Sequence, residues 1–150
     1  MSRNVLNKLT HALTIAGLCV AAASASAVPV QCDLDIDGNG VVDGLTDGLL
    51  LMRAAEGVGG FDLVADAIGE GATRVHPAEI LAHVSEQVAL LDIDGDGIFD
   101  SATDALMIVR HLFGFTEDTV MRGALRGDSP RRNWHALRMH LERCYTPPVS

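Results

Sequence analysis

The chain has 150 residues, of which 48% are hydrophobic and 21% charged, and its formal net charge is −9. A chain of this length is typical of a single domain. Aromatic residues make up only 4% of the sequence, which is too few for the stacking platform on which many proteins hold single-stranded nucleic acid.

Residues 1–27 have the features of a secretory signal peptide. Arg3 and Lys8 form a basic start, residues 13–23 are apolar, and residues 25–27 (Ala-Ser-Ala) provide a cleavage site. The apolar stretch is too short for a stable membrane span, although an uncleaved N-terminal anchor is the alternative. We therefore expect residues 28–150 to be the mature protein, exported to the extracellular space or the periplasm, or held at the cell surface.

Two cysteines, Cys32 and Cys144, remain in the expected mature chain. An isolated pair of this kind in an exported protein most often forms a disulfide. The bond would close a loop of about 110 residues, which makes it a stabilising cross-link for a small domain. A zinc site would need further cysteine or histidine residues at close spacing, and the sequence has none.

An acidic motif occurs twice in the sequence. Residues 35–47, here called loop one, read DIDGNGVVDGLTD, and residues 92–104, loop two, read DIDGDGIFDSATD. In each loop, oxygen-bearing side chains occupy places one, three, five, nine and thirteen, and a glycine occupies place six. These side chains are Asp35, Asp37, Asn39, Asp43 and Asp47 in loop one, and Asp92, Asp94, Asp96, Asp100 and Asp104 in loop two.

Alternate side chains of such a loop point toward one centre, where a hard cation with six to eight oxygen ligands, typically Ca²⁺, would bind. The motif departs from the EF-hand pattern, because place twelve holds Thr46 or Thr103 and the last acid comes one residue later. We expect the threonine to cap the following helix. An ordinary acidic surface turn is the alternative for one loop, but two loops with the same departure favour two calcium ions.

The helices are predicted from apolar spacing and from start and stop residues. Residues 46–56 and 103–113 form the helices that leave the two loops, and residues 61–68 form a short helix. Residues 77–91 form one long helix that enters loop two, and residues 130–144 form the last helix. Loop one has no helix in front of it.

The similarity continues beyond the loops at the spacing that separates Asp35 from Asp92, here called the repeat offset. At this offset Arg74 falls on Arg131 and Ile80 falls on Leu137. The similarity predicts that residues 28–150 are one domain made of two units, about 35–91 and 92–148. Neither unit could bury its apolar face alone, so we expect the two to pack together as an all-α domain.

Six arginines are concentrated near the C-terminus, where a basic patch could indicate an anionic partner such as nucleic acid. We favour the interpretation that they cover a solvated helix and offset the acidic loops, with no nucleic-acid partner. The residues are Arg122, Arg126, Arg131, Arg132, Arg138 and Arg143.

The duplicated D-x-D-x-[DN]-G-x-x-D loop, each copy followed by one helix, resembles the dockerin type I domain. The stretch from Asp100 to Gly114 is similar to dockerin-like repeats of secreted or surface proteins without a cellulosome. The resemblance implies two EF-hand-like units packed with pseudo-twofold symmetry, and a cohesin-like protein partner in polysaccharide-degrading or cell-surface assemblies. It also implies that the carbonyls of Val41 and Ile98 join the ligands, and that Asp43 and Asp100 bind directly or through water.

These observations predict a non-catalytic, calcium-folded interaction module. A calcium sensor or buffer that opens a groove is the alternative, although Met52 and Met107 suit a core better. No histidine or serine falls in a catalytic motif such as H-E-x-x-H, so we do not expect an enzyme. Loop two has five carboxylates against four in loop one, and this count predicts tighter binding at loop two.

Overall fold

The computed structural model describes residues 32–144, and the predicted signal peptide at 1–27 lies outside this range. Among the described residues there is no strand, which agrees with the predicted all-α class, and no helix is long and apolar enough to cross a membrane. The elements are α1 (Asp47–Ala55), α2 (Phe61–Val64), α3 (Pro77–Glu86), α4 (Val88–Leu91), the π-helical turn η1 (Ser101–Ala105), α5 (Leu106–Leu112), α6 (Asp118–Met121) and α7 (Trp134–Cys144).

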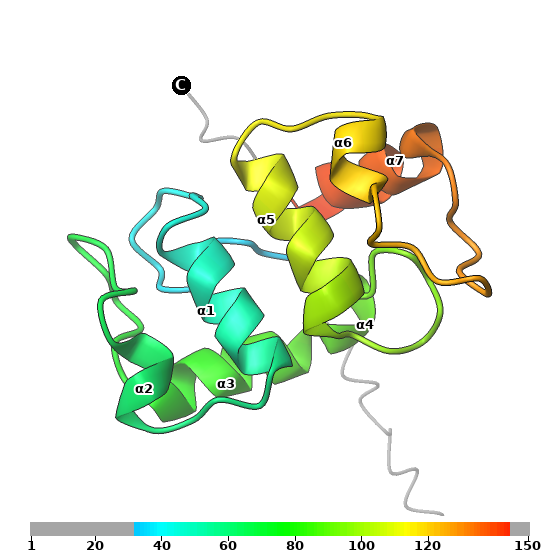
Figure 1. Cartoon of the computed structure of the whole chain (residues 1–150). Helices are drawn as coiled ribbons and strands as arrows, with labels where there is room; N and C mark the ends of the chain where they lie inside the picture. The colour runs from blue at the N-terminus through cyan, green and yellow to red at the C-terminus, as the bar shows by residue number, and fades with distance from the viewer. Residues whose placement is uncertain (1–31, 145–150) are drawn as a thin grey trace, which may run out of the picture.

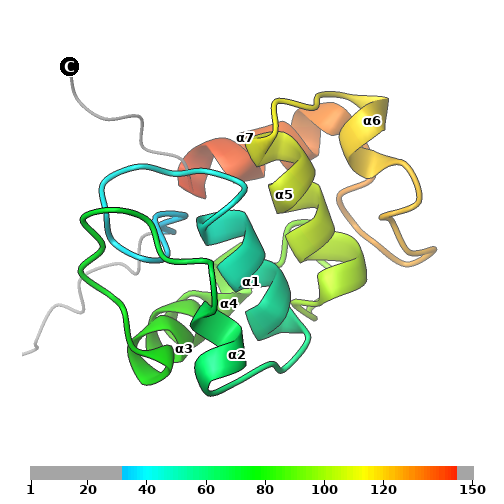
Figure 2. The same ribbon diagram turned by 60° about the vertical axis from the view of Figure 1, so that its left-hand side comes forward.

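Helices α1 and α5 lie side by side at the centre of the molecule (Figure 1). Helices α2 and α3 lie on one side of this central pair, and α6 and α7 lie on the other side, which Figure 2 shows from a second direction. Within the described residues, which start at Cys32, no helix precedes loop one, and the loop leads into α1, whereas α4 leads into loop two, as the sequence predicts. The two loops therefore deliver their following helices to a shared centre.

The prediction of one helix over 77–91 is wrong, because the helix is interrupted at Gln87, between α3 and α4. Gln87 is buried, and its side-chain amide pairs with the backbone of Asp33. The Asp33 N–H donates to Gln87 Oε1 (2.7 Å), and Gln87 Nε2 donates to the Asp33 carbonyl (2.8 Å). One side chain thus holds the segment that leads into loop one, and periodicity does not reveal it because the two residues are distant in sequence.

The last two predicted helices begin or end at other residues than expected. Helix α7 begins at Trp134 rather than at 130, because the Asn133 side chain accepts a hydrogen bond from the Ala136 N–H (3.0 Å) and caps the helix there. The predicted helix over 103–113 begins earlier, as the turn η1 at Ser101, and α5 ends at Leu112.

The short helix α2 ends at Val64 rather than at 68. At Ala65 the backbone leaves the helical conformation (φ −56°, ψ 119°), and the Arg53 guanidinium donates hydrogen bonds to the carbonyls of Leu63 (2.9 Å) and Ala65 (2.7 Å) at this end of the helix. Helix α6 is not among the predicted elements, although it starts one repeat offset after α2. The same contact recurs there, since Arg110 donates to the Val120 carbonyl (2.8 Å).

The core is built from residues that recur at the repeat offset. Sixteen buried apolar residues form eight such pairs. The pairs are Leu34 with Leu91, Ile36 with Ile93, Leu50 with Met107, Leu51 with Ile108, Leu63 with Val120, Ala67 with Ala124, Ile80 with Leu137, and Val84 with Leu141. All sixteen belong to one hydrophobic cluster, so both halves of the described chain contribute corresponding side chains to a single core.

The ends of the described chain are joined. The Sγ atoms of Cys32 and Cys144 lie 2.05 Å apart, at bonding distance for the predicted disulfide. Both cysteines are buried in the same cluster as the core residues. The cross-link ties the segment before loop one to the last turn of α7.

Candidate metal centre

Each loop gathers three carboxylates around one point. Oxygens of Asp35, Asp37 and Asp47 lie within 4.8 Å of one another in loop one, and oxygens of three further residues do so in loop two, namely Asp92, Asp94 and Asp96. Carboxylate oxygens at this separation could hold one hard cation at each loop. The first and third places therefore converge in both loops, as the sequence predicts.

The last acid of each loop ties the loop closed. In loop one, Asp47 is fully buried, its Oδ1 accepts hydrogen bonds from the N–H groups of Ile36 (2.6 Å) and Asp37 (3.3 Å), and its Oδ2 accepts one from Asp43 (2.9 Å). The same contacts recur in loop two, where Asp104 accepts from Ile93 (2.6 Å), Asp94 (3.1 Å) and Asp100 (3.1 Å). These carboxylates therefore lie inside their loops although they occupy place thirteen rather than twelve.

A π-type turn accommodates the extra residue of each loop. The Ala105 N–H donates to the carbonyl of Asp100 (3.0 Å), five places earlier, and Gly48 donates to Asp43 (3.0 Å) in the same way. A bond from residue i+5 to residue i widens the turn by one residue. The wider turn allows the following helix to begin with its acid pointing back into the loop.

The expectation that Thr46 and Thr103 cap the helices is wrong. Instead, the carboxylate of Asp43 accepts from the N–H groups of Leu45 (2.7 Å) and Thr46 (2.9 Å), and the Thr46 hydroxyl donates to the other Asp43 oxygen (2.9 Å). Asp100 caps in the same way, with Thr103 as a donor. A carboxylate is the stronger acceptor at a helix start, so the acids of place nine cap and the threonines support them.

Burial and hydrogen bonding shift the pKa values of these acids in opposite directions. Burial raises the pKa of Asp47 to about 6, although hydrogen bonds from three backbone N–H groups oppose the rise. Burial likewise raises the pKa of Asp104. Burial alone would also raise the pKa of Asp43, but the hydrogen bonds from Thr46 and Leu45 outweigh it and lower this pKa. The place-thirteen acids are thus the ones for which an ionised form most needs a nearby cation.

Place six has the glycine conformation that the loops require. Gly40 and Gly97 have φ values of +84° and +90°, which side chains other than glycine rarely adopt. Their N–H groups donate to Asp35 Oδ2 and Asp92 Oδ2, both at 2.9 Å. Each glycine amide therefore reports on the first ligand of its own loop.

Arginines from outside the loops hold the loop carbonyls. Arg74 Nε donates to the Ile36 carbonyl (2.8 Å), and its Nη2 donates to the Asp35 carbonyl. Arg131 does the same in loop two, with the carbonyls of Ile93 (2.7 Å) and Asp92 (2.5 Å). The predicted role of Arg131 as a solvated surface residue is thus too general, because its guanidinium fixes the backbone of loop two.

Three further residues contact the ligand side chains, and the motif does not point to them. The Gly69 N–H donates to Asp37 Oδ2 (2.6 Å), and the buried Ser129 hydroxyl donates to Asp94 Oδ2 (2.7 Å). The Arg126 guanidinium forms ion pairs with Asp96 and Asp100 of loop two. Gly69 and Arg126 correspond at the repeat offset. The contact of Gly69 with loop one could therefore have pointed to Arg126 as a contact of loop two.

The side chains of Val41 and Ile98 are more than half exposed, as suits residues proposed to contribute through their carbonyls. Their N–H groups donate to Asn39 Oδ1 (2.7 Å) and Asp96 Oδ1 (2.8 Å). These bonds orient the place-five side chains of both loops.

The donor set fits a hard cation, because every converging side-chain ligand is an oxygen and four or five acids are gathered in each loop. Comparisons of the chain with family models, curated proteins and solved structures find no match. The assignment of the site therefore depends on its own geometry.

Proposed function

We propose that the protein is a non-catalytic calcium-binding module that folds around two Ca²⁺ ions and binds a protein partner outside the cytoplasm. The observation that carries the proposal is the convergence of three carboxylates in each loop, within 4.8 Å of one another. Gathering this much negative charge without a cation is unfavourable. Calcium would remove the repulsion and would contribute its binding free energy to folding.

The proposal includes two EF-hand-like units related by pseudo-twofold symmetry. The core residues that recur at the repeat offset support this arrangement, as do the matching contacts of Asp47 with Asp104 and of Arg74 with Arg131. The bond between Cys32 and Cys144 supports a location outside the cytoplasm, where disulfides persist.

Thermal unfolding tests the calcium part of the proposal. Residues 28–150, kept oxidised, are melted with millimolar Ca²⁺ and then with a chelator, and helix content is followed by circular dichroism. A site at 100-fold saturation stabilises the fold by about 2.7 kcal/mol, so two sites give about 5 kcal/mol and, at roughly 4 °C per kcal/mol, about 20 °C in Tm.

The variants Asp35→Asn and Asp92→Asn are the controls, since each keeps the side chain's shape and removes one charge from one loop. Each should lose part of the calcium-dependent shift, and the double variant should lose most of it. Equal melting temperatures in calcium and chelator for the unmodified chain would refute calcium-dependent folding.

The proposed partner is a cohesin-like domain, and the resemblance to dockerins motivates it. At the positions where dockerins often carry a Ser-Thr pair for cohesin contact, this chain has Gly44 and Leu45 instead. Both residues line an apolar groove of about 260 Å³ between α1 and α5. Leu45 and Phe113 line the groove and are 71% and 53% exposed. Gly44 lies against the Phe113 ring, since an added Cβ would be 2.8 Å from it. The groove thus offers exposed apolar surface for a partner.

Calorimetric titration with a purified cohesin domain, with and without Ca²⁺, tests the partner. Leu45→Asp should abolish binding, whereas Phe61→Asp makes a comparable change at a 78% exposed position on α2, outside the groove, and should leave it intact. Calcium-dependent folding without cohesin binding would favour the alternative, a calcium buffer or sensor. Met107 is fully buried in the core, so a sensor of this kind would have to expose a core residue.

A further inference from the structure

The two loops differ in one ligand, and the residue that faces this ligand differs as well. Place five is Asn39 in loop one and Asp96 in loop two. At the corresponding position outside the loops, Gly69 faces loop one and Arg126 faces loop two. Loop two therefore has one more negative and one more positive charge than loop one, and the two charges are in contact.

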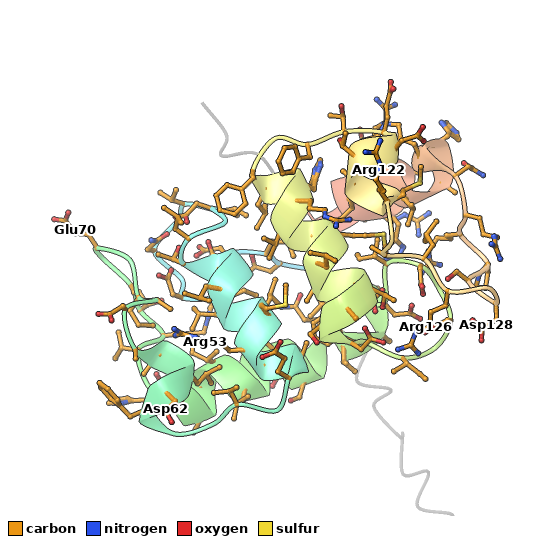
Figure 3. All side chains as sticks on the ribbon, in the orientation of Figure 1. Arg53, Asp62, Glu70, Arg122, Arg126 and Asp128 are labelled. Atoms are coloured by element: carbon orange, nitrogen blue, oxygen red, sulfur yellow. A yellow bond between two sulfur atoms is a disulfide. The ribbon has the colours of Figure 1, made fainter. Side chains whose placement is uncertain are left out.

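The contact in loop two is an ion pair with two carboxylates. Arg126 Nη1 lies 3.7 Å from Asp96 Oδ2, and Arg126 Nη2 donates a hydrogen bond to Asp100 Oδ2. The Asp96 side chain is only 3% exposed, whereas the Arg126 side chain is 45% exposed. Figure 3 shows Arg126 beside the loop between α4 and α5. The guanidinium thus reaches into the acidic loop from the solvent side.

Loop one has no room for such a side chain. A Cβ added to Gly69 would lie 2.2 Å from Asn39 Nδ2 and 3.0 Å from Asp37 Oδ2. The backbone of Gly69 therefore occupies the space next to the Asn39 amide, and no side chain fits there. Among the described residues, only ligands of loop two form ion pairs.

The charge balance follows from these contacts. Within the described part of the chain, loop one has four carboxylates and no ion-paired arginine, and loop two has five carboxylates and one arginine. The fifth carboxylate, Asp96, is one of the two that Arg126 contacts. The advantage that loop two would have from its carboxylate count is thereby cancelled.

We propose that Arg126 is a tethered counter-ion of loop two that competes with calcium for Asp96 and Asp100. The proposal depends on the calcium-binding function proposed above and concerns its regulation. A calcium ion at loop two must displace the guanidinium or bind beside it, and both outcomes weaken binding through lost or repulsive charge interactions. Loop one has no such competitor in the part of the chain that the structure describes and fills first, which reverses the order expected from the number of carboxylates.

The test is a calcium titration followed by ¹H–¹⁵N correlation spectra, in which the Gly40 and Gly97 amides report on the two loops separately. In the unmodified chain, the amide resonance of Gly40 should shift at a lower calcium concentration than the amide resonance of Gly97. Arg126→Gln should tighten calcium binding at Gly97 about three- to tenfold, somewhat more than a fully exposed ion pair would give, because Asp96 is almost fully buried. It should leave Gly40 unchanged.

Two further variants isolate the contact. In the Asp96→Asn background, the effect of Arg126→Gln should become smaller, because one of the two carboxylates that the arginine contacts is gone and only the pair with Asp100 remains. Arg122→Gln is the matched control, since it removes one positive charge from an exposed arginine next to α6, away from loop two (Figure 3). Arg122→Gln should leave the midpoints of the calcium titration unchanged at both the Gly40 and the Gly97 amide.

Melting in chelator provides a readout without calcium. Arg126→Gln should lower Tm there, because five carboxylates lose their counter-ion, and Arg122→Gln should not. The proposal is overturned if Arg126→Gln weakens calcium binding at Gly97 or leaves it within twofold of the unmodified value while both glycines respond to calcium. If neither glycine responds to calcium, the calcium function itself fails, and the competition fails with it.

Discussion

Replacing Gly69 with alanine tests whether a residue far outside loop one shapes its metal site. The backbone of Gly69 has no positive φ, so alanine meets no conformational strain there. Its Cβ would, however, lie 2.2 Å from Asn39 Nδ2, far closer than real contacts allow. The amide of the place-five ligand must therefore turn away, or the Gly69 segment must move away from Asp37.

Overpacking of this kind costs about 1–3 kcal/mol. If about 1–2 kcal/mol of this falls on the calcium-bound geometry, calcium binding at loop one weakens about 5- to 30-fold. Loop two should keep its affinity, because the contacts of Gly69 are with loop one. The Gly40 amide measures the first effect and the Gly97 amide measures the second, both by calcium titration in ¹H–¹⁵N spectra.

Gly59→Ala is the matched control. An added Cβ at Gly59 meets nothing within 4 Å, and its φ is not positive, so this variant should bind calcium like the unmodified chain. Equal calcium affinities at loop one in Gly69→Ala and Gly59→Ala would refute the reasoning, since they would mean that the contact with Asn39 does not constrain the site.

Three further outcomes are expected. Gln87→Ala leaves the Asp33 N–H and carbonyl without partners, so urea unfolding should show a loss of about 2–4 kcal/mol, whereas the exposed Ser85→Ala should stay within about 0.5 kcal/mol; equal losses in the two variants would contradict the role of Gln87. Replacing Cys32 and Cys144 by serine removes a cross-link across a sequence separation of 112 and should lower the unfolding free energy by about 4–5 kcal/mol. An unchanged unfolding free energy would contradict the disulfide. Burial lowers the pKa of His111, so the unfolded chain binds more protons there, and stability should fall as the pH drops from about 6.5 toward the lower pKa of the folded state. His111→Gln should reduce this slope of the Tm–pH curve in saturating calcium, and an unchanged curve would contradict the assignment.

The sequence is enough to predict the loops and the helices that leave them. Alternation of acids and the glycine at place six are local features, and α1 begins within a residue of its expected start. The burial of α1 also follows from the sequence, because the helix predicted over 46–56 is apolar nearly all round, and Leu50 and Leu51 are fully buried.

What the sequence does not predict depends on contacts between distant segments. The break at Gln87 exists because the side chain reaches the backbone of Asp33, and no periodicity encodes that partner. The donors Gly69 and Ser129 also lie outside the motif, and they do not correspond at the repeat offset, since one uses its backbone and the other its hydroxyl. The third-place ligand of each loop thus accepts a similar hydrogen bond from a residue that does not correspond in the two halves. No repeated sequence pattern marks these donors.

The polar groups of the two loops explain why a cation, rather than more protein, would complete the fold. The N–H groups of places two and three donate to Asp47 or Asp104, and the carbonyls of places one and two accept from Arg74 or Arg131. The backbone is thus largely satisfied by the chain itself. The negative charge of the carboxylates is not neutralised in this way, because among the described residues only Arg126 forms ion pairs with loop ligands. Loop one, with four acids and no guanidinium paired with them in that part of the chain, therefore has the greater need for a bound ion.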